Sequence, residues 1–189
     1  MKANTNRKVY LMYKSGTELL KKYFKVSTIY KYGFNWSPMY RRTTAKIIEV
    51  SDDLLYIKIR LKLNWKNRNY AGTMFGGSML AATDPIYMIQ LIQILGDNYV
   101  VWDKAVDAKY KKPAKGTIYG EFIFTEEEIE KIKEKIKNDN QLDIVKAMSL
   151  VDENNNTIAS FNKTLYIADK KFYKNKIKTR KKTTKLSDL

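Results

Sequence analysis

The sequence predicts an α+β domain in which a curved antiparallel sheet wraps around one long central helix. Two observations predict this fold class. Strand-like segments follow one another with turns between them, and one helix-length segment, Ser78 to Leu95, is apolar on nearly every side. Because such a helix must bury all its faces, a sheet curved around it is the most economical arrangement. The helix also needs cover beyond its own sheet, so we expect a homodimer; further pairing into a tetramer stays open.

Residues 1–33 are predicted to form an N-terminal helical extension. Apolar positions recur there at steps of three and four residues, which favours an amphipathic helix or a helix pair that ends before a turn at residues 33–38. The positions in this series are Val9, Met12, Tyr13, Gly16, Leu20, Tyr23 and Phe24.

Residues 34–169 are expected to form the main domain. Residues 55–63 alternate strictly between apolar and polar side chains, as in a half-buried strand. Thr125 and Glu128 match a capping box and predict a short helix after them. The strands are predicted at residues 44–50, 55–63, 99–110, 116–124, 143–151 and 157–167.

The formal net charge of +16 is concentrated at the two ends of the chain. Residues 1–31 carry +7 and residues 170–189 carry +8, which leaves +1 for everything between them. We expect residues 170–189 to be a disordered basic tail. A merely solvated tail and a tail that touches RNA, DNA or anionic lipid are both open, but charge alone supplies only nonspecific, salt-sensitive contact.

The chain contains no cysteine and no histidine. Disulfides, thiolate metal sites and a histidine base are therefore excluded, and neither a metal nor a separate cofactor is expected. The longest apolar run, residues 79–95, is interrupted by Asp84, Pro85 and two glutamines, and the N-terminus lacks a signal-peptide pattern. These features predict a cytoplasmic protein without a membrane span.

The stretch N-Y-A-G-T-M-F-G-G-S, residues 69–78, leads into the apolar helix. Its glycines permit tight turns, and the first N–H groups of the helix point at an anion or a developing oxyanion. Asp84 follows Gly77 by seven residues, close to two helical turns. A carboxylate among apolar residues is either paired or functional, but Asp84 could equally mark a helix broken by Pro85. Both interpretations are open from the residues alone.

This stretch, with Asp84, Y-V-V-W-D-K-A at residues 99–105 and K-T-L-Y-I at residues 163–167, resembles the DUF4442 family of hotdog-fold proteins over roughly residues 34–169. It is also similar to the phenylacetate-degradation type of acyl-CoA thioesterase, whose pattern N-x-x-G-x-x-H-G-G ends seven residues before a catalytic aspartate. Phe75 stands where that pattern has histidine, as is common in DUF4442 proteins.

The resemblance implies hydrolysis of an acyl-CoA thioester between two subunits, with coenzyme A present only as part of the substrate. Gly77 would hold the thioester oxygen by its N–H group, Asp84 of the partner subunit would attack or activate water, and Asn69 would orient that water or the carbonyl. The remaining residues expected to bind substrate are Arg68, Thr73, Phe75, Gly76 and Ser78. The alternative is a noncatalytic hotdog module that binds acyl-CoA or an acyl carrier.

Charged residues elsewhere have two interpretations each. Asp103 or Lys104 could line an acyl or coenzyme A channel, or could pair at a sheet edge. Lysines at positions 111, 112 and 115, together with Arg68, could hold coenzyme A phosphates or form a solvated loop.

Overall fold

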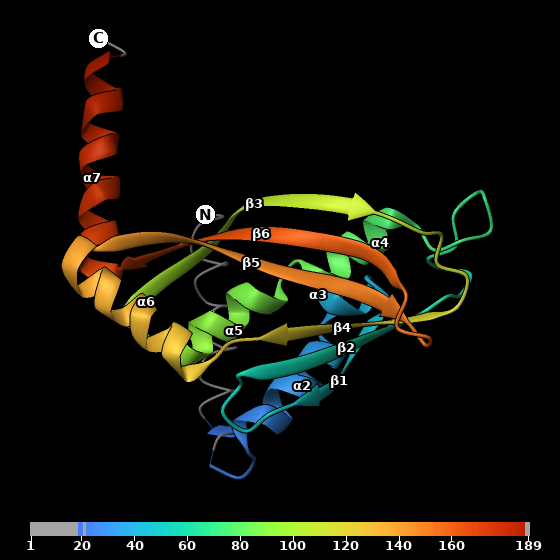
Figure 1. Ribbon diagram of the computed structural model, residues 1–189. Coiled ribbons are helices and arrows are strands. Elements are labelled where there is room, and N and C mark those ends of the chain that lie inside the picture. The colour runs from blue at the N-terminus through green and yellow to red at the C-terminus, as the bar shows by residue number, and fades with distance from the viewer. Residues whose placement is uncertain (1–18, 21, 188–189) are drawn as a thin grey trace.

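The computed structural model describes residues 19–20 and 22–187, with side chains described as far as residue 180 (Figure 1). Six antiparallel strands form one sheet in the order β1-β2-β4-β5-β6-β3. The strands are β1 Ala45–Val50, β2 Tyr56–Lys62, β3 Tyr99–Tyr110, β4 Thr117–Ile123, β5 Gln141–Asp152 and β6 Thr157–Asp169. The predicted fold class and all six predicted strands are confirmed.

The central helix lies in the concave face of the curved sheet and is broken once (Figure 1). It consists of α4, Gly76–Thr83, and α5, Ile86–Leu95, so the predicted helix is interrupted where the helix-break interpretation of Asp84 and Pro85 predicts. The break falls at Asp84 and Pro85 because proline has no N–H to donate to the carbonyl of Ala81. The core joins apolar residues of both helices to the inward-facing residues of the strands, and Leu91, Ile59, Phe122 and Leu165 are among its fully buried members.

By length and composition alone, the 20-residue stretch Gly76–Leu95 could cross a membrane. Half of its most apolar window is buried inside this fold, and a helix in a protein core passes the same test. The burial assigns it here to the core.

The N-terminal part contains α2, Val26–Trp36, and the short helix α3, Pro38–Arg41. Gly33 lies inside α2, so the predicted turn at residues 33–38 is wrong: a glycine costs a helix only about 1 kcal/mol, and Pro38 starts α3 at its first position. The predicted series from Val9 to Gly16 lies outside the described residues. Asn35 of α2 exchanges hydrogen bonds of 2.8 and 2.9 Å with the backbone of Ile47, which covers the edge strand β1.

Helix α6, Glu126–Asp139, begins with the predicted capping box. The N–H of Glu128 donates to Thr125 Oγ1 at 3.1 Å, and the N–H of Thr125 donates to Glu128 Oε2 at 2.9 Å. Each bond satisfies a helix-end donor that would otherwise lack a partner.

The chain after β6 forms helix α7, Lys170–Ser187, where the sequence led us to expect a disordered tail. Two features account for the difference. Asp169 Oδ1 accepts hydrogen bonds from the N–H groups of Lys171 and Phe172, which caps the helix, and lysine and arginine are good helix formers. The helix projects away from the rest of the fold (Figure 1).

Candidate functional site

A pocket of about 510 Å³ opens beside the N-terminal half of the central helix. It brings together four of the residues that the sequence predicts for the site: Phe75, Gly77, Ser78 and Asp84. The remaining lining comes from α3, the residues after it, α4 and the helix break, and consists of Met39, Arg42, Thr43, Leu80, Ala81 and Pro85. The pocket is therefore apolar along most of its wall and carries one acidic and one basic side chain.

Unpaired backbone donors lie at the start of α4. The N–H groups of Ser78 and Met79 both donate to the carbonyl of Phe75, at 3.0 and 3.3 Å. Among the described residues, the N–H groups of Gly76 and Gly77 have no hydrogen-bond acceptor. Such free donors, reinforced by the helix dipole, favour an anion or an oxygen that gains negative charge.

Two aromatic rings pack closely on the two glycines of the motif. A Cβ atom added to Gly77 would come within 2.3 Å of the Phe75 ring, and one added to Gly76 would come within 3.1 Å of the Tyr110 ring. The Tyr110 hydroxyl also donates a 3.1 Å hydrogen bond to the Gly76 carbonyl. The last residue of β3 is thereby joined to the start of α4. Sequence reasoning placed Tyr110 only in a strand, because nothing in its neighbourhood shows which helix it meets.

Asp84 lies at the break between α4 and α5 and belongs to a cluster of three charged residues. Lys163 Nζ lies 3.1 Å from Asp84 Oδ1 and 2.9 Å from Asp103 Oδ1, and it also donates to the main-chain carbonyl of Asp84. The exposed fractions of the side chains are 58% for Asp84, 25% for Asp103 and 1% for Lys163. Asp84 is thus paired with Lys163, lines the pocket and stands at the helix break.

Burial raises the pKa of Asp103 above the ordinary aspartate value, and the nearby charge of Asp84 raises it further. The hydrogen bond and the positive charge of Lys163 act in the opposite direction but do not cancel the effect. The pKa of Asp103 therefore reports on both of its charged neighbours.

Two buried tyrosines donate hydrogen bonds to carbonyl groups around the helix break. Tyr40 donates to the carbonyl of Ala82 at 3.2 Å, and Tyr30 donates to that of Ile86 at 3.5 Å. Burial raises the pKa of both hydroxyls above the ordinary tyrosine value, so they remain neutral donors. The break that exposes Asp84 is therefore stabilised by hydrogen bonds from outside the helix.

The predicted residues Arg68, Asn69, Thr73 and Gly76 do not line this pocket. The Asn69 amide donates to Thr73 Oγ1 at 2.9 Å, and the N–H of Thr73 donates to Asn69 Oδ1 at 3.0 Å. Arg68 pairs with Met74 in an isolated bridge. Within this chain Asn69 closes the turn that contains Gly72, whose φ of 78° suits glycine.

Residues 27–167 match the family model described as a domain of unknown function, DUF4442. The chain belongs to the DUF4442 family. The match covers the helix break, the glycine pair and the sheet as far as residue 167 of β6. No curated protein sequence matches this DUF4442 chain.

Solved structures show the fold of this DUF4442 protein. A protein of unknown function from Pseudomonas aeruginosa, described as a probable thioesterase, is 18% identical with a TM-score of 0.61, over 68% of this chain and 85% of its own. A protein of unknown function from Chlorobaculum tepidum is 20% identical with a TM-score of 0.61, over 76% and 94%. A thioesterase from Haemophilus influenzae is 12% identical with a TM-score of 0.53, over 72% and 87%. The DUF4442 chain has the hotdog fold that the resemblance implied.

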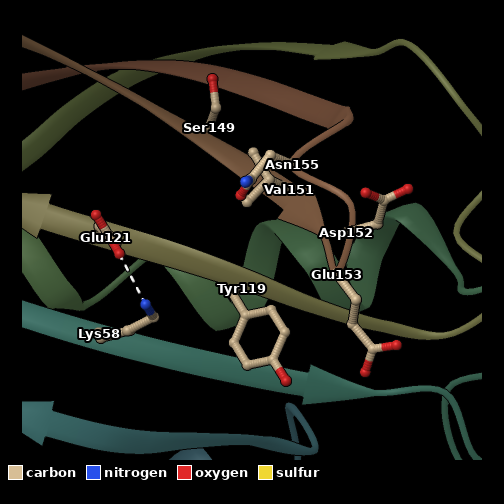
Figure 2. Close-up of a pocket in the computed structure, with 8 residues that line it drawn as sticks. All are labelled: Lys58, Tyr119, Glu121, Ser149, Val151, Asp152, Glu153 and Asn155. Atoms are coloured by element: carbon tan, nitrogen blue, oxygen red, sulfur yellow. Dashed lines mark ion pairs between the residues drawn. The ribbon is translucent and has the colours of Figure 1, made fainter.

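A second pocket lies on the outer face of the sheet, across β2, β4 and β5 (Figure 2). Figure 2 shows the ion pair between Lys58 and Glu121, which lie 2.9 Å apart, on the side of the sheet away from the central helix. Asp152 also lines this second pocket. It accepts hydrogen bonds from the N–H groups of Asn154 and Asn156 and so stabilises the turn between β5 and β6. None of the predicted site residues lies there.

The other charged residues considered for the site lie outside the pocket beside α4. Lys104 pairs with Asp143 of β5 on the surface of the sheet, as in the sheet-edge interpretation, while Asp103 turns inward to Lys163. Lys112 reaches Asn156 at 3.4 Å, and Lys111 and Lys115 are exposed. In the described part of the chain, no three acidic side chains gather in a way that could hold a metal ion.

Proposed function

We propose that this DUF4442 protein hydrolyses acyl-CoA thioesters. The observation that carries the proposal is the pocket in which a half-exposed carboxylate, Asp84, shares a mostly apolar wall with the free-donor end of a helix at Gly77. A thioester needs a fixed donor for its oxygen and a modest base or nucleophile for its carbon, and the lining of the pocket has a residue of each kind. In the proposed reaction the donor of one copy would act together with the carboxylate of a second copy. Structural neighbours named as thioesterases are consistent with the proposal.

The reaction converts the thioester and one water molecule into a carboxylic acid and the free thiol of coenzyme A. The N–H of Gly77 would donate to the carbonyl oxygen as it gains negative charge, and this donor needs no reorganisation because the helix holds it in place. Asp84 would take a proton from water, or attack the carbonyl carbon itself. The apolar wall beside Leu80 and Ala81 suits an acyl chain.

Helix geometry argues that two subunits share each site. Gly77 and Asp84 are seven residues apart, so their Cα atoms lie roughly 10 Å apart along the axis, and the N–H of Gly77 points toward the N-terminus, away from Asp84. Reacting atoms must approach within about 3.5 Å, and groups from two copies can do so without spanning this length of helix. We therefore propose that a second copy supplies the carboxylate.

Strand β3 offers the surface for that second copy. It is a 12-residue edge strand, and within the described residues no strand pairs with its outer side. Three large apolar side chains on it, Trp102, Val106 and Tyr110, are exposed. An unpaired edge of this length is a template for strand pairing, and we propose a homodimer joined along β3, which places Tyr110 and the glycines of α4 next to the seam.

A noncatalytic acyl-CoA-binding module is the second candidate, and Phe75 favours it. Its apolar ring covers Gly77 where the similar thioesterases have an imidazole, so the site lacks one donor or acceptor. A protein that holds a thioester without hydrolysing it would keep the pocket and lose little from this change.

The test is a screen of acyl-CoA chain lengths, read by thiol release, with Asp84→Asn and a matched control. We expect wild-type turnover on at least one chain length and a loss of about 100-fold or more in kcat for Asp84→Asn. Asp139→Asn, at an exposed end of α6, should keep wild-type activity. Absence of turnover with any chain length, or an Asp84→Asn variant as fast as wild type, would overturn the enzyme proposal. Tight acyl-CoA binding without turnover would support the binding module.

A further inference from the structure

Lys163 is a buried lysine on a strand face that is otherwise apolar. Phe161, Lys163 and Leu165 alternate along β6 toward the central helix, and all three are almost completely buried. A lone buried ammonium costs several kcal/mol, and a hydrophobic residue of similar volume often packs equally well or better. Core stability therefore does not explain a lysine at this position. The explanation must lie in the contacts that Lys163 makes.

Lys163 holds Asp84 at two points. It donates to the main-chain carbonyl of Asp84 and lies 3.1 Å from the side-chain atom Oδ1. The second carboxylate oxygen, Oδ2, has no hydrogen bond or ion pair to any described residue, and Asp84 faces the pocket. One oxygen is thus anchored inside the fold and the other is left for a ligand.

Asp103 competes for the same ammonium. It lies on β3, beside the bulge between Asp103 and Ala105, and its Oδ1 atom is 2.9 Å from Lys163 Nζ. One positive charge faces two carboxylates, so the cluster keeps one net negative charge when all three groups are ionised. Asp103 is the less exposed of the two carboxylates, which leaves Asp84 as the group able to direct that charge into the pocket. Arg42 is the other charged side chain in the lining of that pocket.

We infer that Lys163 is a positioning residue for Asp84: it fixes the carboxylate by one oxygen, presents the other to the pocket, and shares its charge with Asp103. The inference rests on the proposed function for its kinetic consequence. The coupling of the three charges is a property of the fold, and it can be measured whether or not the protein turns over a thioester.

The first experiment measures that coupling by NMR. The protein is labelled with 13C at aspartate, and the side-chain carboxyl of Asp103 is titrated with pH over the range in which the protein stays folded. Replacing Asp84 by asparagine should lower the pKa of Asp103, because a like charge is removed. Replacing Lys163 by methionine should raise it, because the ammonium is lost. Lys104→Met, which removes the exposed partner of Asp143 from the same strand, should leave the Asp103 titration unchanged. The inference would be overturned if the pKa of Asp103 were the same in wild type, Asp84→Asn and Lys163→Met.

The second experiment measures kcat and KM with the acyl-CoA that wild type hydrolyses best. Lys163→Met should lower kcat about tenfold or more and change KM less than about threefold, since the pocket walls stay in place while the carboxylate loses its anchor. Asp103→Asn keeps the lysine, frees it for Asp84, and should keep at least wild-type kcat. Lys163→Met with wild-type kcat would overturn the positioning role while leaving the proposed function intact.

Folding of the variants is checked by circular dichroism and thermal unfolding. If Lys163→Met does not fold, Asp103→Asn and Asp84→Asn decide the question. A drop of more than about tenfold in kcat for folded Asp103→Asn would contradict the competition between the carboxylates. A wild-type protein without turnover would end the proposed function, and the Asp103 titration would still decide the inference.

Discussion

The ring of Phe75 lies over the Cα atom of Gly77, so closely that an added Cβ would meet Cε1 of the ring at 2.3 Å. The ring is itself more than half exposed and lies beside the first turn of α4. An apolar ring thus stands next to Gly77, whose N–H group is the donor in the proposed function.

Phe75→His should raise kcat for thioester hydrolysis by about tenfold. An imidazole in place of the ring adds a hydrogen-bonding group next to the Gly77 N–H, where negative charge develops on the oxygen; removal of one such donor from an enzyme typically costs 100-fold or more. Steady-state kinetics with the best acyl-CoA measures the effect. Phe75→Leu, which changes the shape without adding a polar atom, is the control. Equal rates for the two variants would show that a donor at this position does not limit the reaction.

The double variant Trp102→Lys and Val106→Lys should convert a dimer into monomers. Both side chains are exposed on the edge strand β3, and a twofold axis along this edge would bring four new positive charges together in place of an apolar contact. Light scattering coupled to size-exclusion chromatography measures the mass, and hydrolysis should disappear with the dimer. Val145→Lys replaces an even more exposed apolar residue of β5, in the interior of the sheet, and should leave the mass unchanged. A double variant that remains dimeric would place the interface elsewhere.

Gly120→Ala should destabilise the fold by about 1 kcal/mol, because the ends of two core side chains have to shift. Gly120 lies on β4, and a Cβ there would come within 2.7 Å of Leu150 Cδ2 and 2.9 Å of Met148 Cε in the packed core. Urea unfolding measures the change in the free energy of unfolding. Gly116→Ala is the matched control, because no atom lies within 4 Å of its added Cβ and its φ is not positive. Equal stability of the two variants would mean that the core side chains around Gly120 rearrange without a cost in stability.

Glu128→Gln should destabilise the protein at neutral pH and have no effect in acid. Burial alone would raise the pKa of Glu128, but the hydrogen bonds from Lys146 and from the Thr125 N–H outweigh it and hold the pKa below the ordinary 4.5. A lowered pKa gives stability that is present above 4.5 and is lost as the pH falls through the lowered value. Because the Glu128 side chain is 44% exposed, we expect less than about 1 kcal/mol.

Urea unfolding of this variant at pH 7 and at pH 3 tests the sign. Glutamine can still accept in the capping box, so the difference reports mainly on the ion pair with Lys146. Glu134→Gln, at an exposed position of the same helix, should unfold like wild type at both values. A deficit of equal size at both pH values would assign the effect to packing instead of charge.

Local patterns in the sequence were enough to predict the strands and the start of α6. Alternation along residues 55–63 reports one buried face, and the capping box at Thr125 involves residues only three positions apart, so neither depends on the rest of the fold. The same local reasoning was wrong where a neighbour decides the outcome. Gly33 continues a helix that packs on β1, and the chain after Asp169 becomes helical from a cap that only the end of β6 provides.

The candidate site also has features that the local sequence predicts and features that it does not. The sequence by itself determined the spacing from Gly77 to Asp84 and the break at Pro85, because both follow from the repeat of one helix and the missing N–H of proline. Only the tertiary structure decided that Asn69 closes its own turn, that Tyr110 meets Gly76, and that Lys163 joins Asp84 to Asp103. Asp84 and Lys163 are 79 residues apart and meet because β6 lies beside β3 under the helix break. Strand order in a sheet is fixed by how the whole core packs, and no short segment of the sequence contains that information.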